Sequence, residues 1–311
     1  MIKVTLTNEI LSYITEIEQN RYKVSSVKLS KAVMNRLRKN SKKKSSYASN
    51  KIEGNPLSEK QVDEVIESDE RKHYLKPEQE VRNYFLALNY LEEKVNKKEK
   101  FSKKLILDVQ KLVEKGASKE KIGLRGPMPS GVLFAVYDSK TGNPDYIPPE
   151  YCDIPGLLDE LIEYVNTTDD HPLIVAAVVH YQLVTIHPFE DGNGRTARLL
   201  SGYIMDLNGY GFNGVGSLEE YFAYDIDEYY ESIQMGLPAL YYSGRENPPH
   251  PEIWIHYFLR MVKLYSGKVC DLQLASEEED IAGSLSFLKG KEKELLQFLM
   301  KNLSLIHISE P

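Results

Sequence analysis

The segment from His187 to Arg198 brings a proton acceptor, an acid and two arginines into twelve residues. An imidazole has a pKa near neutrality, so His187 is suited to take a proton from an attacking hydroxyl at pH 7. Asp191 offers carboxylate oxygens, which Mg²⁺ prefers as ligands. Arg195 and Arg198 lie three positions apart, so on a helix their guanidinium groups are neighbours that suit a polyphosphate. Together these residue types indicate transfer of a phosphate-linked group from a nucleotide to a hydroxyl.

The segment before His187 must hold this residue in position. Residues 171–186 are apolar nearly all round after an initial proline, which predicts a buried helix. This helix must end near His187, because Pro188 lacks an N–H group and disfavours a helical conformation in the residue before it.

A glycine turn after His187 must lead into the segment that carries the two arginines. Gly192, Asn193 and Gly194 are followed by a helical pattern over residues 195–205. Glycine tolerates the left-handed backbone conformation that such a turn needs, and the first N–H groups of a helix have no partner within it. The turn therefore predicts an anion site.

The segment resembles the signature loop of the Fic family, whose pattern is H-P-F-x-[DE]-G-N-G-R-x-x-R. The sequence here is His187-Pro-Phe-Glu-Asp-Gly-Asn-Gly-Arg-Thr-Ala-Arg198, and every fixed position matches. The resemblance covers about residues 45–265 and implies a mainly α fold, a Fic-type helical bundle with a β-hairpin flap. It also implies a protein adenylyltransferase that moves AMP from ATP, with Mg²⁺, to a Ser, Thr or Tyr hydroxyl of a protein substrate.

The resemblance gives each residue of the loop a role in this reaction. His187 would deprotonate the target hydroxyl, and Asp191 would bind Mg²⁺. The remaining residues would hold phosphate oxygens, with the arginines on the β- and γ-phosphates: Gly192, Asn193, Gly194, Arg195 and Arg198.

A second motif lies far upstream, in Ser49-Asn-Lys-Ile-Glu-Gly54. Ser49 and Glu53 are four positions apart and share one face of a helix, which Gly54 and Pro56 end. The segment resembles the inhibitory motif of the same family, [ST]-x-x-x-E-[GN], in the subclass with an N-terminal inhibitory helix. The resemblance implies that Glu53 pairs with Arg198 and holds the enzyme inactive.

Residues 131–147 predict a β-hairpin, because β-branched and aromatic residues flank a turn of Asp, Ser, Lys, Thr, Gly and Asn. The hairpin matches the position of the family's flap, which clamps the target segment. The flap residues that we expect to contact the target are Val132, Leu133, Phe134 and Tyr146. Further on, the paired tyrosines of the family predict that one of Tyr229 and Tyr230 lines the adenine pocket, and Tyr230 is our candidate.

Composition and charge narrow the class of protein. The chain has 311 residues, 41% of them hydrophobic, and a net charge of −7, which argues against binding nucleic acid over the whole surface. Eleven Lys or Arg and no acid lie between Gln19 and Ile52, which predicts a solvated helix face or, as an alternative, a contact for an acidic partner. Without a signal pattern or a long apolar run, we expect a cytoplasmic protein that does not enter a membrane.

The pattern of elements divides the chain into four parts. Residues 1–60 predict an N-terminal helical region with the inhibitory motif, and residues 61–265 the catalytic domain. Residues 266–302 predict the start of a winged-helix-like module that too few residues remain to complete. Residues 303–311 coincide with the translation of a sequencing-library adapter, so we expect them to be an artefact.

Three other functions remain open. The same loop can serve removal of the adenylyl group, with Glu53 orienting water, or transfer of another phosphate-linked group. Outside enzymes, the basic run and the winged-helix-like start suggest a DNA-binding regulator in which the fold is a scaffold. Self-modification and a homodimer are further expectations for the partners of the chain.

Overall fold

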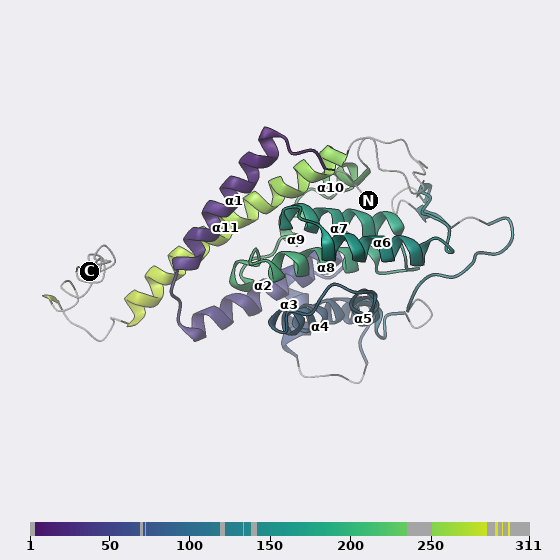
Figure 1. The fold of residues 1–311 in the computed structure, drawn as a ribbon. Helices are drawn as coiled ribbons and strands as arrows, with labels where there is room; N and C mark the ends of the chain where they lie inside the picture. Colours follow the sequence, from purple (N-terminus) through teal and green to yellow (C-terminus); the bar gives the residue numbers. More distant parts are fainter. Residues whose placement is uncertain are drawn as a thin grey trace.

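A computed structural model of the chain describes residues 4–68, 71, 73–118, 122–132, 134–137, 142–234, 251–284, 290, 291, 294 and 298. Helices make up most of this part, so the expected fold class is confirmed (Figure 1). The helices are α1 (Asn8–Ser26), α2 (Lys31–Ile52), α3 (Glu59–Glu67), α4 (Lys76–Asn96), α5 (Lys103–Glu114), α6 (Ile154–Thr167), α7 (Pro172–Ile186), α8 (Asn193–Leu207), α9 (Glu219–Phe222), α10 (Ile226–Gln234) and α11 (Pro251–Ser284), with a 3₁₀ turn, η1 (Phe212–Gly214).

Helix α7 lies at the centre of the bundle and packs against α6, α8 and α11. Residues 173–181 of α7 are all buried, because this stretch has apolar or small side chains on every face apart from His180. The neighbouring helix α8 is also buried over most of its length. The loop between α7 and α8 is therefore supported on both sides by rigid core helices.

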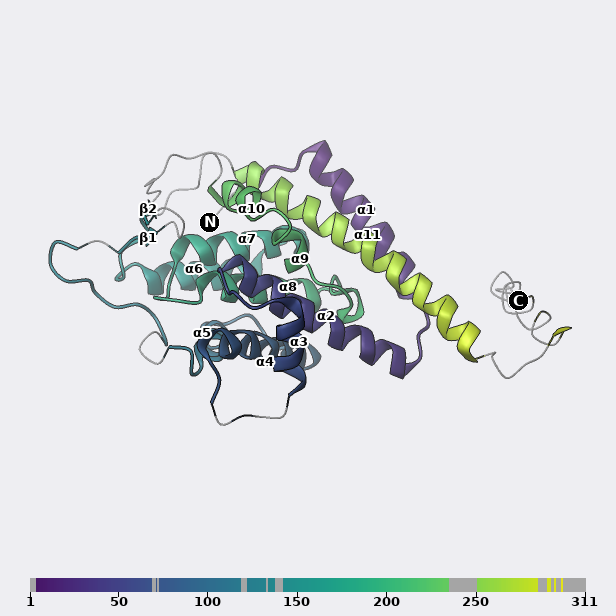
Figure 2. The same ribbon diagram turned by 180° about the vertical axis from the view of Figure 1, so that it is seen from behind.

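Helices α1 and α11 run side by side and in the same direction, as both views show (Figures 1 and 2). Their contacts advance together along the two chains, from Thr7 with His256, through Asn20 with Ser266, to Ser30 with Asp280. The amphipathic face of each helix supplies the apolar surface that the other covers.

Helix α11 does not end at the boundary predicted between residues 265 and 266 but continues through Gly267 to Ser284. A glycine costs a helix interior only about 1 kcal/mol relative to alanine. The buried side chains of Val262, Tyr265 and Val269 lie on both sides of Gly267, and their packing outweighs that cost. The predicted boundary between residues 265 and 266 thus falls inside one helix.

Most of the basic run of α2 is the exposed face that the sequence predicted, but Lys42 and Lys43 are largely covered by neighbouring helices. Lys42 contacts Glu92 of α4 at 2.6 Å, and Lys43, only 8% exposed, contacts Glu67 of α3 at 2.7 Å. Lys44 pairs with Glu220 at 3.1 Å. These lysines join α2 to its neighbours, and a DNA-binding role for them loses support.

The expected hairpin is present but short, with strands β1 (Val136–Tyr137) and β2 (Pro144–Tyr146). They are antiparallel, with Val136 opposite Tyr146 and Tyr137 opposite Pro144. Most of its predicted turn, Leu133 and the residues from 299 on lie outside the described residues. Within the described ranges, no helix has the length and apolar character needed to span a membrane.

Candidate active site

His187 ends α7 in a left-handed conformation, with φ 47° and ψ 58°. This conformation turns the chain sharply out of the helix and is uncommon for a residue other than glycine. The His187 Nδ1 atom lies 3.2 Å from the carbonyl oxygen of Val184. Because a carbonyl only accepts, Nδ1 carries the proton in the neutral ring, and Nε2 is left as the basic nitrogen.

Burial lowers the pKa of His187 to about 4, although the hydrogen bond to the Val184 carbonyl acts in the opposite direction. Arg125 adds to the lowering through its positive charge. The imidazole is therefore neutral at pH 7 and ready to accept a proton on Nε2.

The turn between Asp191 and α8 has the shape of an anion site. Gly192, with φ 80°, caps the helix, and the side chain of Asn193 closes the loop by bonding both backbone groups of Phe189 at 2.9 and 3.0 Å. The first N–H groups of α8 lack partners within the helix and carry the positive end of its dipole. The Asn193 side chain thus shapes the turn itself, which leaves the backbone N–H groups as its donors to a phosphate.

Arg198 of α8 is buried, and every end of its guanidinium is bonded. Its Nε donates to Ser49 Oγ at 2.8 Å, and its Nη2 donates to the Ser49 carbonyl at 3.0 Å and to Glu53 Oε1 at 2.6 Å. A Cβ on Gly194 would overlap this same Oε1 atom. The Glu53 carboxylate therefore lies over the turn, beside Arg198, where an anion would bind.

Tyr229 and His180 support Arg198 from the core. Arg198 Nη1 donates to Tyr229 OH at 3.2 Å, and this hydroxyl lies 3.0 Å from His180 Nε2. The neighbouring Tyr230 is about half exposed and donates to the Ile52 carbonyl at 3.3 Å. The pair is thus divided, since Tyr229 contacts the arginine and Tyr230 lies at the surface beside the end of α2.

Arg195 lies beneath the turn and faces carboxylates. Its Nη2 donates to Glu114 Oε1 at 2.9 Å and to Asp191 Oδ1 at 3.3 Å, and its Nη1 lies 3.8 Å from Glu80. Arg195 is 3% exposed and Glu114 is 1% exposed. Burial raises the pKa of the Glu114 carboxyl to about 7, although the Arg195 guanidinium acts in the opposite direction. The two arginines of the motif are therefore held by different carboxylates.

The donors of the site fit a phosphate group better than they fit a metal held by protein alone. Arg195 Nε and Nη1 are buried without a hydrogen-bond partner, and since Nη1 lies 3.8 Å from Glu80, Nε is the donor that remains for an anion. Within the described part of the chain, no three His, Cys, Asp or Glu side chains are arranged to hold a metal ion. Mg²⁺ with a nucleotide needs only one or two carboxylates, and Asp191, with 30% of its side chain exposed, meets that requirement.

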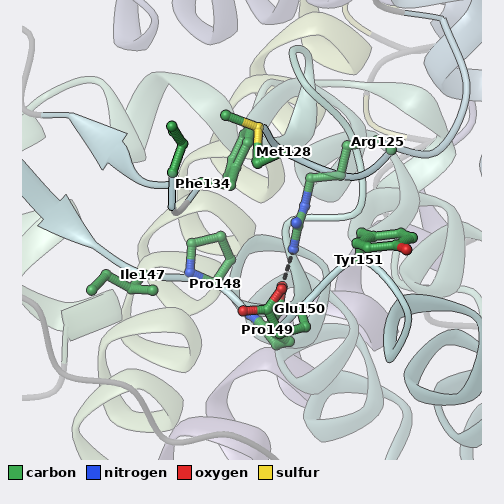
Figure 3. Close-up of a pocket in the computed structure, with 10 residues that line it drawn as sticks. Arg125, Met128, Phe134, Ile147, Pro148, Pro149, Glu150 and Tyr151 are labelled. Carbon is green, nitrogen blue, oxygen red and sulfur yellow. Dashed lines mark hydrogen bonds between the residues drawn. The ribbon is translucent and has the colours of Figure 1, made fainter. Parts of the chain in front are cut away.

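Arg125 connects the His187 loop to the flap side of the molecule. Its backbone N–H bonds the Pro188 carbonyl at 2.9 Å, its Nε donates to the His187 carbonyl at 2.8 Å, and its Nη2 donates to the Pro149 carbonyl. Figure 3 shows Arg125 reaching across a pocket to the segment that follows β2. Burial lowers the pKa of Arg125.

The pocket next to Arg125 places two of the expected flap residues together. Its apolar lining includes Val132, Phe134 and Met128, and it continues along Ile147, Pro148, Pro149, Glu150 and Tyr151 (Figure 3). The Phe134 ring lies 5.9 Å from the His187 ring, centre to centre. Tyr146 instead points to α7, because its hydroxyl donates to the Thr185 carbonyl at 2.8 Å. The pocket thus opens beside the base.

Sequence reasoning did not identify Glu114, Arg125 or His180 as part of the site. One signal pointed to Glu114: it follows Gln110 by four positions on the face of α5 that Val109 and Val113 bury, where an acid needs a partner. Nothing comparable marked Arg125, whose contacts lie 24 and 62 positions away in the chain.

Comparison with known proteins gives one family. Residues 100–205 match the Fic/DOC family, a range that contains the His187 loop, α5 and α7. The chain is 28% identical over 204 residues to the protein adenylyltransferase Fic of Drosophila grimshawi, which is 63% of this chain and 40% of that protein. It is 29% identical over 202 residues to the protein of the same name from Aedes aegypti, 62% of this chain and 38% of that one. The chain therefore spans about two fifths of the length of these relatives.

Solved structures agree on the fold. A Fic family protein from Desulfovibrio desulfuricans G20 has a TM-score of 0.65 and 22% identity, covering 88% of this chain and 77% of that one. Fic-1 from C. elegans, residues 134–508, has a TM-score of 0.66 and 23% identity, covering 87% and 73%. At this identity the likeness supports the shared arrangement of helices.

Proposed function

We propose that the chain is a protein adenylyltransferase, because residues 100–205 match the Fic/DOC family. It transfers AMP from ATP, with Mg²⁺, to the hydroxyl of a Ser, Thr or Tyr on a protein substrate and releases pyrophosphate. The observation that carries the proposal is the arrangement of one loop. It joins a neutral His187 with a basic Nε2 to an anion-binding helix start and to Arg198.

His187 supplies the proton acceptor. Its Nε2 takes the proton of the target hydroxyl as that oxygen attacks the α-phosphorus of ATP. The new bond joins the hydroxyl oxygen to this phosphorus, and the bond to the oxygen bridging the α- and β-phosphates breaks. Pyrophosphate leaves with the electron pair of that bond, so the step balances without a further reactant. The hydrogen bond from Nδ1 to Val184 fixes the ring for this transfer.

The turn and the arginines bind the phosphates. The N–H groups of Asn193 and Gly194 would bond phosphate oxygens, and that of Gly192 would do so in exchange for its present bond to Asp191 Oδ1. Arg195 and Arg198 would fix the β- and γ-phosphates for in-line displacement. Bound Mg²⁺ supplies charge neutralisation between phosphate oxygens, and Asp191 is the residue of this chain that would hold it. Arg195 Nε, which is buried without a hydrogen-bond partner, and the Glu53 carboxylate lying against Gly194 as an anion support these roles.

The flap binds the protein substrate. An extended target segment pairs with the short hairpin through backbone hydrogen bonds, as an added strand does at an open sheet edge. Val132, Leu133, Phe134 and Tyr146 are the proposed flap residues, and the pocket next to Phe134 receives an apolar side chain of the target. Tyr230, at the surface beside the end of α2, is the proposed neighbour of the adenine ring.

Glu53 keeps this site inactive in the proposed mechanism. Its carboxylate occupies the space above Gly194 and bonds Arg198 Nη2. A γ-phosphate would need the same guanidinium and the same space, so the two anions compete.

The proposal is tested by intact-mass measurement after incubation with Mg²⁺ and each nucleoside triphosphate in turn. We expect the Glu53→Gly variant to gain the mass of an adenylyl group from ATP, on itself or on an added protein. The same variant with His187→Ala should keep nucleotide binding and lose the adduct. Undiminished transfer in the double variant would refute the role of His187, and an adduct of another nucleotide would redirect the proposal to that group.

A further inference from the structure

The buried carboxylate of Glu114 has no task in the reaction proposed above, yet it lies at the centre of the nucleotide site. It belongs to the last turn of α5, it is 1% exposed, and its Oε1 atom accepts from Arg195 Nη2 at 2.9 Å. A Cβ on Gly192 would come within 2.7 Å of the same oxygen. Glu114 therefore lies against the turn at Gly192, whereas Glu53 lies against it at Gly194.

Arg195 connects Glu114 to Asp191. A single nitrogen, Nη2, donates to the carboxylates of both residues, at 2.9 Å to Glu114 and at 3.3 Å to Asp191. Of the two carboxylates, that of Glu114 is buried, whereas that of Asp191 is partly exposed to solvent. The Asp191 oxygen that faces Arg195 also accepts from the Gly192 N–H at 2.8 Å.

We infer that Glu114 is a positioning residue, which holds the Arg195 guanidinium beneath the turn and thereby fixes the carboxylate of Asp191 for Mg²⁺. The inference rests on the proposed function, since that function gives Asp191 its ion. Without Glu114, the Arg195 guanidinium would interact with the Asp191 carboxylate alone and would compete with Mg²⁺ for it. With Glu114 present, the positive charge of Arg195 is shared, and Asp191 keeps the electron density that a Mg²⁺ ligand needs.

The negative charge of Glu114 is what matters in this arrangement, so the test replaces it by an amide of the same shape and is made at pH 8, above the pKa of about 7 of this carboxyl. The Kd for ATP is measured by calorimetry in the Glu53→Gly chain, once in EDTA and once in excess Mg²⁺. The Kd in EDTA divided by the Kd in Mg²⁺ reports how much Mg²⁺ tightens the binding of ATP. We expect Glu114→Gln to lower this ratio about 10-fold, the lower end of the effect of removing a direct partner of a metal ligand, because Glu114 acts on Asp191 through Arg195. The Kd in EDTA should stay within about threefold of the parent chain or become tighter, because one negative charge near the phosphates is gone.

Glu80→Gln provides the matched control. Glu80 lies 3.8 Å from Arg195 Nη1 and bonds Asn55 through its other oxygen, an interaction that glutamine retains. The Glu80→Gln variant also removes one negative charge near Arg195, but Glu80 has no hydrogen bond to Nη2. We therefore expect the ratio of the Kd values to change less than about threefold.

Two outcomes overturn the inference. If Glu114 has only a structural role, Glu114→Gln weakens both Kd values equally and leaves the ratio unchanged. If Asp191 holds no Mg²⁺, the ratio is already near one in the parent chain. Failure of the proposed function looks different, because a parent chain with a large ratio and no adduct in the mass measurement contradicts adenylyl transfer and leaves the inference standing.

Discussion

Glu53 and Arg198 meet at 2.6 Å across 145 positions of the chain, and their burial is unequal. The Arg198 side chain is 1% exposed, whereas that of Glu53 is 33% exposed. Arg198 also keeps Ser49 and Tyr229 as partners when Glu53 is absent. Glu53 is therefore the member of the pair that is removed at little cost to the fold.

Replacing Glu53 by glycine should raise self-modification by labelled ATP roughly 5- to 150-fold, the range that a coupling of about 1–3 kcal/mol gives. The gain arises because Arg198 and the space above Gly194 become available to phosphate. Lys51→Gly is the control, since it places a glycine in the same exposed helix end without touching Arg198. Equal labelling of the Glu53→Gly variant and the parent chain would remove Glu53 from this role.

The pH dependence of transfer should lack the decline near pH 6.5 that an exposed histidine gives. The folded protein holds the His187 proton less tightly than a free imidazole, with a pKa of about 4. The base is therefore present from pH 8 down to about pH 5, and its activity is lost only as the pH approaches 4. A pH–rate profile of the Glu53→Gly chain at saturating Mg²⁺ and ATP measures this. A fall in the rate centred near pH 6.5 would show that burial does not lower the pKa of His187.

The same shift predicts how stability follows pH. Below about pH 6.5 the unfolded chain takes up a proton at His187 that the folded chain does not. The free energy of unfolding should therefore fall as the pH decreases from 6.5 toward 4. Urea titrations at several pH values should show a smaller decline in His187→Asn than in the parent chain, and parallel curves would contradict the shift.

Tyr229→Phe should lower the free energy of unfolding by about 1–3 kcal/mol, because it leaves Arg198 Nη1 and His180 Nε2 buried without this partner. The affinity for ATP should fall with it, since Arg198 loses one of its fixed contacts. Tyr230→Phe is the matched control, with a weaker bond to Ile52 and a half-exposed ring. Urea denaturation and calorimetry measure both effects, and equal losses in the two variants would mean that Tyr229 does not position Arg198.

Gly194→Ala should weaken ATP binding by about tenfold or more even in the Glu53→Gly chain. The added methyl group would stand where Glu53 Oε1 now lies, which is the space proposed for a phosphate. Gly202→Ala, on the same helix, has no atom within 4 Å of the new carbon. That variant should keep its affinity and gain about 0.5–1 kcal/mol of stability. Retained affinity in Gly194→Ala would place the phosphates elsewhere.

The sequence predicted those features that depend on neighbours in the chain. The end of α7 at His187 follows from Pro188, and the start of α8 follows from Gly192, so the loop was predicted with its two helices. The contact between Glu53 and Arg198 needed a family resemblance, because no pattern in one sequence connects two positions so far apart.

Other features depend on contacts that the order of residues does not reveal. Glu114 and Arg195 come together only because α5 packs on α8. Helix α11 passes through Gly267 because α1 covers it over a long face, which outweighs the local preference of glycine. The sequence predicted that the lysines of α2 face solvent. The acids that pair with Lys42 and Lys43 belong to α4 and α3, and only the packing of these helices brings them to α2.

The anchoring of α2 on both sides of Glu53 limits how the proposed inhibition by Glu53 could be relieved. Upstream, Lys42, Lys43 and Lys44 tie the helix to three neighbours. Downstream, Asn55 bonds the Pro77 carbonyl and Glu80 on α4 at 3.0 Å. The helix cannot swing away as a rigid rod without breaking all of these contacts at once. These contacts favour removal of Glu53 from Arg198 by a change in its own side chain and the end of α2 over movement of the whole helix.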